Sequence, residues 1–473
     1  MTKPTEQQKV QALYHLIGER GLYVNTNYDI FTKKPEDVPL GTAYKIPLIQ
    51  NGSKAYASPL LFAALTSLLN HGTILITGAP GIGKTTGAEF AGHFFTGTPL
   101  EEILSAEIQG HPQLTEEKMV ASYDIGKLLA TPSEKIVIPT RFLECPVKIL
   151  DEGTRTPPDV LSIIMRLVDT GKAVYGGKLL KAKPGPLFVT ANYADEGTFH
   201  FTPPFLDRFD VAVIVTSPKP ADLRKIRERG DEKLTGDLEK CLTIPEDLKL
   251  DFEKIRREIS NISEARANDV PVVSSFADFL YGSLRFSEVA SDSLARSTKG
   301  NAWYTNQDNA PPGHFRDAPF TYTLNELSVR TVRAMQRYAK AFAWFTGKDE
   351  VDLGDFKTVL PYLLWHKIQP SSKALTENTK FSNDRISFIE ELLEKIENDY
   401  SELAGSDALK LYSSAMNVLR TGKIKDKDLN QEDIRNIVRN AISRLGGIDK
   451  PYAITLATHI ASEFNSRFNG VKR

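Results

Sequence analysis

A glycine-rich stretch early in the chain carries the residue types that hold phosphate groups. Residues 78–86 read GAPGIGKTT and satisfy the pattern G-x-x-x-x-G-K-[ST]. In such a loop the glycines let backbone N–H groups turn inward, the lysine adds positive charge at the β- and γ-phosphates, and the threonine hydroxyl can bind Mg²⁺. The residues expected to bind a nucleotide are Gly78, Ala79, Pro80, Gly81, Ile82, Gly83, Lys84, Thr85 and Thr86.

The segments on either side of this loop are those that a phosphate-binding loop requires. The run TILIT at 73–77 is typical of a short buried strand, and the following KTTGAEFAGHFF is typical of a helix. That helix would direct the positive end of its dipole at a bound anion. The alternative is a glycine turn with no ligand, and the two matching flanks argue against it.

Two adjacent carboxylates follow a second apolar run, VKIL at 147–150. At the end of a buried strand, Asp151 would join Thr85 in holding Mg²⁺, and Glu152 would orient and deprotonate an attacking water. The alternative is a pair of solvated carboxylates in a turn. Their position after a buried strand, downstream of the phosphate loop, favours the catalytic interpretation.

Two further polar residues lie at the edges of later apolar runs. Asn192 ends the segment FVTAN, where its amide could sit between the γ-phosphate and the water, although an asparagine at a strand end can also be a simple turn former. Arg208 lies in FLDRFD, just before the strand VAVIV. From there it would reach a neighbouring subunit's nucleotide more easily than its own. The alternative for Arg208 is a surface salt bridge.

Alternating short strands and helices must position these side chains. Buried strands are expected at 73–77, 147–150, 186–192 and 211–215, with helices between them. This alternation indicates a parallel sheet covered on both faces. A strong helix precedes it at 58–72, and the two strands around Gly176 and Gly177 predict a hairpin over 172–182, with Tyr175 at its tip.

Helical periodicity dominates the remainder of the chain. A leader helix is expected in EQQKVQALYHLIGERG, and helices and loops replace the alternating pattern from about residue 219. At least four more helices are expected from about residue 371. The first of these carries one apolar stripe, formed by Ile389, Leu392, Leu393, Ile396, Tyr400 and Leu403.

The composition narrows the possible function classes. Among 473 residues, 59 Lys and Arg balance 60 Asp and Glu, so no overall charge draws the chain to nucleic acid or to an anionic membrane. The N-terminal residues are polar and charged, unlike a signal peptide, and no apolar run approaches the roughly 18 residues that span a bilayer. We therefore expect a cytoplasmic protein without a membrane span and without a metal other than Mg²⁺.

The four motifs taken in order resemble those of the AAA+ ATPases, and details resemble the MoxR branch. ILDEGTRTPPDVLSIIMRLVD is similar to that branch's D-E-I-N-R-x-P-P segment, and EGTFHFTPPFLDRFD at 196–210 is similar to its E-G-T-Y-x-L-P-E-A-x-L-D-R-F segment. Residues 327–368 resemble its lid. The resemblance covers roughly residues 45–370.

The resemblance implies an α/β P-loop AAA+ parallel sheet core with an α-helical lid and a C-terminal helical extension. It implies a leader helix and linker over 1–45, a nucleotide-binding core over 46–218, a lid over 219–370 and the extension over 371–473. Insertions at 108–142 and 172–186 would face a central pore or a client, which makes Tyr175, at the tip of the hairpin, a candidate pore contact. Arg330 matches the lid arginine that contacts nucleotide phosphates, and Arg333 is the alternative.

The function implied is that of a chaperone-like ATPase. Such proteins use ATP and Mg²⁺, usually form hexameric rings and remodel a protein client, often with a von Willebrand factor A-domain partner. Gly153 and Thr154 depart from the Ile-Asn that usually follows the two acids. Two alternatives remain open: a nucleic-acid motor or loader, and a scaffold that binds ATP with little turnover. The choice of ATP over GTP follows from the resemblance alone.

Overall fold

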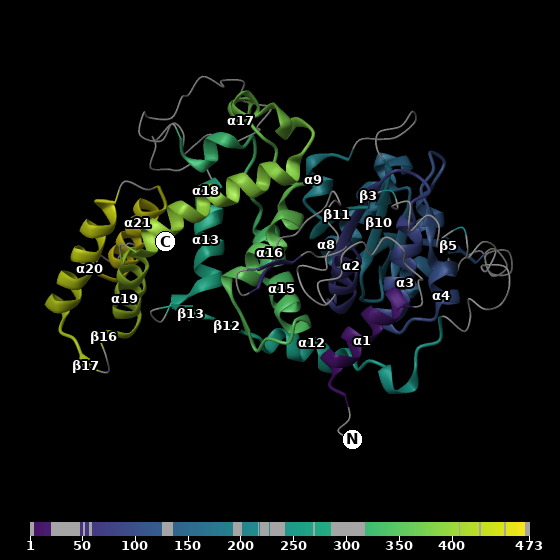
Figure 1. Ribbon diagram of the computed structural model, residues 1–473, viewed down its shortest axis with the longest axis horizontal. Helices are drawn as coiled ribbons and strands as arrows, with labels where there is room; N and C mark the ends of the chain where they lie inside the picture. Colours follow the sequence, from purple (N-terminus) through teal and green to yellow (C-terminus); the bar gives the residue numbers. More distant parts are fainter. Residues whose placement is uncertain are drawn as a thin grey trace. The chain divides into compact units, whose positions relative to one another are not determined.

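A five-stranded parallel sheet organises the first part of the computed structural model. Its spatial order is β11-β3-β10-β7-β4, and β3, β10 and β11 lie side by side (Figure 1). Its strand interiors are buried, which explains why these segments read as continuous apolar runs. The predicted parallel sheet is confirmed. The strands are β3 (Thr73–Gly78), β4 (Ile108–Gln109), β7 (Lys148–Asp151), β10 (Leu187–Ala191) and β11 (Val211–Val215).

The described residues fall into two units. Unit one combines Met1–Ser263 with Arg333–Leu363, and unit two combines Glu264–Val332 with Leu364–Arg473. Parts of the range 219–370, expected as one lid, are thus found in both units. The structure describes residues 4–19, 48–50, 53–55, 59–124, 136–192, 201–215, 217, 227, 242–267, 270–284, 317–405, 407–424, 427–448 and 451–468.

Helices connect and cover the strands of unit one. Helix α2 (Pro59–Leu68) packs on α3 (Lys84–Thr96) and on β3 and β11, whereas α4 (Leu100–Ala106) packs on β7. The segment 108–142, expected as an insertion, begins with β4, the edge strand of the sheet. The other short elements in this part of the chain are β1 (Leu48–Gln50), β2 (Ser53–Ala55), α5 (Glu116–Met119), α7 (Arg141–Glu144), η2 (Gly153–Arg155), α8 (Pro158–Thr170) and α9 (Pro203–Leu206).

Two antiparallel hairpins project from this core. Strand β5 (Ala121–Tyr123) pairs with β6 (Val137–Pro139), and β8 (Lys172–Tyr175) pairs with β9 (Lys178–Lys181) around the predicted glycine turn. The interpretation of Tyr175 as a pore contact is wrong for this structure. Its ring is buried, its hydroxyl donates to Glu117 Oε1 at 2.8 Å, and it lies against Tyr123.

The leader helix α1 (Glu6–Glu19) is part of the core of unit one. Its apolar face is buried, with Leu13 and Ile17 fully covered. The carboxylate of Glu6 accepts a hydrogen bond from the backbone N–H of Asp251 at 2.9 Å, at the start of α12 (Phe252–Asn261). The side chain of Gln11 donates to the carbonyl of Phe345 at 2.7 Å. The leader is therefore held by residues far along the chain, with η4 (Glu246–Leu248) beside it.

Two later helices return to unit one. Most of α15 (Val329–Phe345) and most of α16 (Leu353–Leu364) belong to unit one and pack near α2. The hydroxyls of Tyr338 and Thr66 lie 2.8 Å apart, and the Phe62 and Tyr362 rings stack with their centres 4.8 Å apart. The buried Asp210 carboxylate accepts a hydrogen bond from Arg337 Nη2 at 2.9 Å. The short strands β12 (Ser263–Glu264) and β15 (Glu350–Val351) complete this part of the chain.

Helices form unit two. The apolar stripe predicted for the first tail helix is buried along α18 (Arg385–Gly405), and the rings of Phe276, Phe279, Tyr400 and Tyr452 meet edge to face. No helix in the described ranges is long and apolar enough to cross a membrane. The elements of this unit are β13 (Arg266–Ala267), β14 (Val270–Pro271), α13 (Val272–Leu284), η6 (Pro319–Tyr322), α17 (Ser372–Glu377), η7 (Thr379–Ser382), α18, α19 (Ala408–Thr421), β16 (Lys423–Ile424), β17 (Lys427–Asp428), α20 (Gln431–Gly446) and α21 (Pro451–Phe468).

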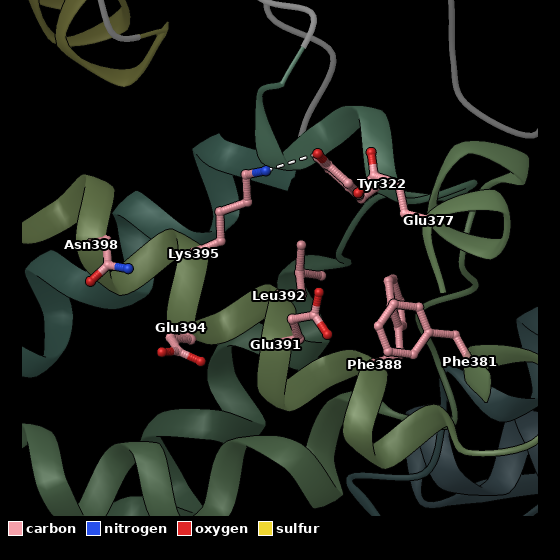
Figure 2. Close-up of a pocket in the computed structure, with 9 residues that line it drawn as sticks. All are labelled: Tyr322, Glu377, Phe381, Phe388, Glu391, Leu392, Glu394, Lys395 and Asn398. Carbon is pink, nitrogen blue, oxygen red and sulfur yellow. Dashed lines mark hydrogen bonds between the residues drawn. The ribbon is translucent and has the colours of Figure 1, made fainter. Parts of the chain in front are cut away.

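A pocket opens beside α18 in unit two. Figure 2 shows Phe381 and Phe388 together on one side, and Lys395 reaching the hydroxyl of Tyr322, to which it donates at 2.9 Å. Lys395 and Lys373 both lie over the Tyr322 ring, at 4.1 and 4.2 Å from its centre. The residues that line the pocket are Tyr322, Glu377, Phe381, Phe388, Glu391, Leu392, Glu394, Lys395 and Asn398.

Replacing Arg337 by methionine should lower the free energy of unfolding by about 1–3 kcal/mol, because the buried Asp210 carboxylate loses its charged donor. Urea denaturation measures the change. Arg333→Met is the matched control, since Arg333 is an exposed arginine one turn earlier on α15. Equal losses in the two variants would contradict a specific role for the Arg337–Asp210 pair.

Candidate functional site

The phosphate loop leaves β3 in a conformation that depends on glycine. Gly83, directly before α3, has a φ of 84°, in the left-handed region that glycine adopts without strain. At Gly78, a Cβ atom would lie 2.5 Å from the carbonyl oxygen of Val215, so β11 leaves no room for a side chain there. The backbone can therefore turn its N–H groups around an anion at the start of α3.

Lys84 is buried beneath this loop and has three acceptors. Its Nζ donates to the carbonyls of Gly78 at 3.0 Å and Ala79 at 2.6 Å, and to Asn192 Oδ1 at 2.8 Å. These bonds use the three ammonium protons. Burial lowers the pKa of Lys84, while the nearby Asp151 and Glu152 oppose that shift. Negatively charged phosphates would restore the preference for the charged form.

Asp151, at the end of β7, forms hydrogen bonds both with the residue after Lys84 and with strand β10. Its Oδ1 accepts hydrogen bonds from the hydroxyls of Thr85 and Thr190, the latter at 2.6 Å. The Thr190 oxygen in turn accepts from the backbone N–H of Glu152 at 2.9 Å. The sequence interpretation missed Thr190, and the signal for it was a hydroxyl inside the apolar strand FVTAN. Converging carboxylate and hydroxyl oxygens fit Mg²⁺, which prefers oxygen ligands, so Thr85 and Asp151 suit the predicted metal site.

Glu152 faces Asn192 across the site. Asn192 Nδ2 donates to Glu152 Oε1 at 3.4 Å, and Arg155 Nη1 lies 3.3 Å from Oε2. Glu152 has a φ of 49°, and a non-glycine residue in this left-handed region costs on the order of 1–3 kcal/mol. The structure thus holds the carboxylate in a strained backbone position beside the amide, where both could contact one water.

Arg208 lies at the opposite end of β3 from the phosphate loop. Its carbonyl accepts a hydrogen bond from the hydroxyl of Thr73, the first residue of β3, at 2.9 Å. Its guanidinium forms an ion pair with Asp169 at 3.1 Å and a hydrogen bond to the carbonyl of Pro204. The salt bridge left open by the sequence is therefore present. Arg330 lies in the first turn of α15, in unit two, and its role and the choice between it and Arg333 stay predictions.

A carboxyl group that the sequence interpretation did not single out lies near Asp151. Burial, and then the charges of Glu89 and Asp151, raise the pKa of Glu107 to about 7. Glu107 directly precedes β4, which pairs with β7, and Glu89 is on α3. Its sequence signal is weak, because an acid before a short edge strand is ordinarily solvated.

Comparison with known proteins agrees with this arrangement. Residues 73–209 match the AAA domain of the dynein-related subfamily, and residues 324–387 match an AAA lid domain. A solved structure of a candidate ATPase from Cytophaga hutchinsonii ATCC 33406 is similar, with 18% sequence identity and a TM-score of 0.53. The likeness covers 82% of this chain and 96% of that one. A search of curated proteins gave no match.

These findings agree with the predicted fold class. The chain has an α/β P-loop AAA+ fold, with a parallel sheet core, a helical lid domain and C-terminal helices. At 18% identity, the likeness to the solved structure concerns the fold alone.

The stability of the metal-free protein should fall as the pH rises through about 7, because of Glu107. Its folded pKa of about 7 lies above the ordinary value of 4.5, so between these values the folded state keeps a proton that the unfolded state has released. Glu107→Gln is neutral at every pH and should therefore be more stable than wild type at pH 8, by on the order of 1 kcal/mol after allowing for solvent screening.

Urea denaturation in EDTA, at pH 6 and pH 8, measures this difference. Glu101→Gln, at an exposed position in the first turn of α4, is the control and should show the wild-type pH dependence. The same slope in Glu107→Gln and wild type would contradict the assignment.

Proposed function

We propose that this AAA+ chain binds ATP with Mg²⁺ and hydrolyses it to ADP and phosphate. The observation that carries the proposal is one connected set of hydrogen bonds at the carboxyl ends of three adjacent strands. It links Lys84 to Asn192 and Asn192 to Glu152, while Thr85 and Asp151 share a bond beside them. A glycine turn or a pair of solvated carboxylates would not require this network.

Each member of the network has a role in the proposed reaction. Lys84 and the loop N–H groups bind the β- and γ-phosphates, and Thr85 and Asp151 would hold Mg²⁺, which neutralises charge on those phosphates when bound. Asn192 holds the attacking water near the γ-phosphate. Glu152 accepts the proton of that water as its oxygen forms a bond to phosphorus and the bond to the ADP oxygen breaks.

Arg208 is proposed to act on a neighbouring subunit. The strand between Thr73, which anchors Arg208, and the phosphate loop at Gly78 spans five residue steps, about 17 Å at roughly 3.3 Å per residue. This exceeds the reach of an arginine side chain, so Arg208 is better placed to complete another subunit's site. Such an arrangement requires a neighbouring subunit, and we propose that the subunits form a hexameric ring.

The finer function proposed is that of a MoxR-like chaperone that remodels or matures a client protein in the cytoplasm. Support comes from the segments ILDEGTRTPPDVLSIIMRLVD and EGTFHFTPPFLDRFD and from the hairpins at β5–β6 and β8–β9. The client could include a von Willebrand factor A-domain protein. We also propose the division into leader (1–45), core (46–218), lid (219–370) and extension (371–473).

Glu152→Gln should bind ATP as wild type does but hydrolyse it at least about 10²-fold more slowly, because the amide cannot accept the proton. Calorimetric titration with ATP and Mg²⁺ measures binding, and phosphate release measures turnover. Glu144→Gln is the control, since Glu144 is an exposed carboxylate on α7 whose partner is Arg141. Turnover near the wild-type rate in Glu152→Gln would contradict the proposed general base.

Turnover per subunit should rise with protein concentration, and Arg208→Ala should lower the plateau by about 10³-fold or more. Both effects follow if a neighbour's arginine completes each site. Arg166→Ala, an exposed arginine on α8, is the matched control. Turnover that is independent of concentration and of Arg208 would contradict the trans arginine. No turnover under any of these conditions would favour a nucleotide-gated scaffold.

A further inference from the structure

We propose that Asp169 is a positioning residue for Arg208. It would orient the guanidinium so that one free edge is presented to the nucleotide of a neighbouring subunit. The inference rests on the proposed ATPase ring and adds a residue that neither the motifs nor the comparisons single out. Asp169 would act through Arg208 and would not touch the nucleotide.

Among the described residues, the hydrogen bonds of Arg208 leave the Nη end of its guanidinium available. Nε donates to Asp169 Oδ2 at 3.1 Å and Nη1 donates to the carbonyl of Pro204, while Nη2 lies 3.1 Å from the same Asp169 oxygen as part of the ion pair. A guanidinium has five N–H donors in a planar fork, and these two hydrogen bonds use one on Nε and one on Nη1, so both Nη nitrogens keep an N–H for a further acceptor. Two neighbouring N–H groups of this kind match a phosphate in a bidentate contact.

Both partners are held by ordered elements. Asp169 lies in the last turn of α8, whose apolar face is buried through Val160, Leu161, Ile164 and Leu167. Arg208 follows α9, and Thr73 bonds its backbone to β3. A charged side chain anchored at both the backbone and one edge loses little further freedom on meeting a phosphate, which is how preorganisation assists catalysis.

The ion pair between Arg208 and Asp169 contributes little to the free energy of folding. The side chains of Arg208 and Asp169 are 22% and 25% exposed, and pairs open to solvent contribute little to folding because water screens them. The geometry is side-on, with two nitrogens on one oxygen, and it restricts the direction of the long arginine side chain. An arginine that contacts a neighbouring subunit's nucleotide must have its side chain oriented toward that subunit.

The first test compares steady-state kinetics of three single variants. Asp169→Asn keeps the size of the side chain but removes its charge, and we expect kcat to fall about 10-fold with KM for ATP unchanged, since the subunit's own pocket is intact. Asp169→Glu restores the charge and should recover part of the loss. Asp159→Asn, at an exposed position in the first turn of the same helix, is the control and should match wild type.

The second test asks whether Asp169 acts through Arg208. In the Arg208→Ala background, Asp169→Asn should cause no further loss of kcat, because its target is gone. Rings assembled from two variants show which subunit the residue acts from. Glu152→Gln protomers keep Arg208 but cannot hydrolyse ATP, whereas Arg208→Ala protomers keep an intact hydrolytic site but lack the arginine. Mixing the two should therefore restore turnover. Adding Asp169→Asn to the Glu152→Gln protomers should reduce the restored turnover about 10-fold. Adding it to the Arg208→Ala protomers should not.

The outcomes separate this proposal from the proposed function. If Arg208→Ala lowers turnover but Asp169→Asn does not, the positioning role is wrong and the ATPase assignment stands. An increase in turnover in Asp169→Asn also overturns the role, because the carboxylate would then compete with phosphate for the arginine. A loss that follows Asp169 on the Arg208→Ala protomers overturns it as well. If Arg208→Ala itself has no effect on turnover, the trans-arginine role and the positioning role of Asp169 both fail, while ATP hydrolysis at each subunit's own site stands.

Discussion

The ammonium of Lys84 is the charge on which the arrangement of the candidate site depends. A buried cation is stable only with acceptors around it, and its three acceptors come from the end of β3 and from the residue after β10. That geometry exists because β10 lies directly beside β3, in parallel register, so their carboxyl ends meet at one edge. Strand β7 on the far side of β10 then places Asp151 and Glu152 within reach of the same edge.

The two ends of strand β3 position two parts of the proposed catalytic machinery. Its last residue starts the phosphate loop. Its first residue, Thr73, forms one hydrogen bond with Arg208 and three with Asp210, and so fixes the segment that carries them. Asp210 in turn pairs with Arg337 on α15. Residues 333–363 are thus part of the same unit as the sheet, and the segment that carries Arg208 is supported by both β3 and α15.

Helix α8 links the partner of Arg208 to the β8–β9 hairpin. Asp169 is next to Thr170, whose hydroxyl accepts from the N–H of Lys172 at the start of β8, and the carbonyl of Gly171 accepts from Ala182 after β9. The base of the hairpin and the partner of Arg208 therefore occupy neighbouring residues. Lys148, at the start of β7, also donates to the carbonyl of Lys183 at 2.6 Å, which ties the hairpin exit to the strand that ends at Asp151.

The sequence by itself determined the strands, the phosphate loop and the polar residues at the strand ends, because local patterns carry that information. Apolar runs of strand length and the G-x-x-x-x-G-K-[ST] spacing are readable without knowing which segments meet, and so is the apolar stripe of α18. Only the tertiary structure decided which side chains touch. The Thr190 bridge, the raised pKa of Glu107, the burial of Tyr175 and the Asp169–Arg208 pair each join residues far apart in the chain. Their distances depend on strand order and helix packing, which no local pattern encodes.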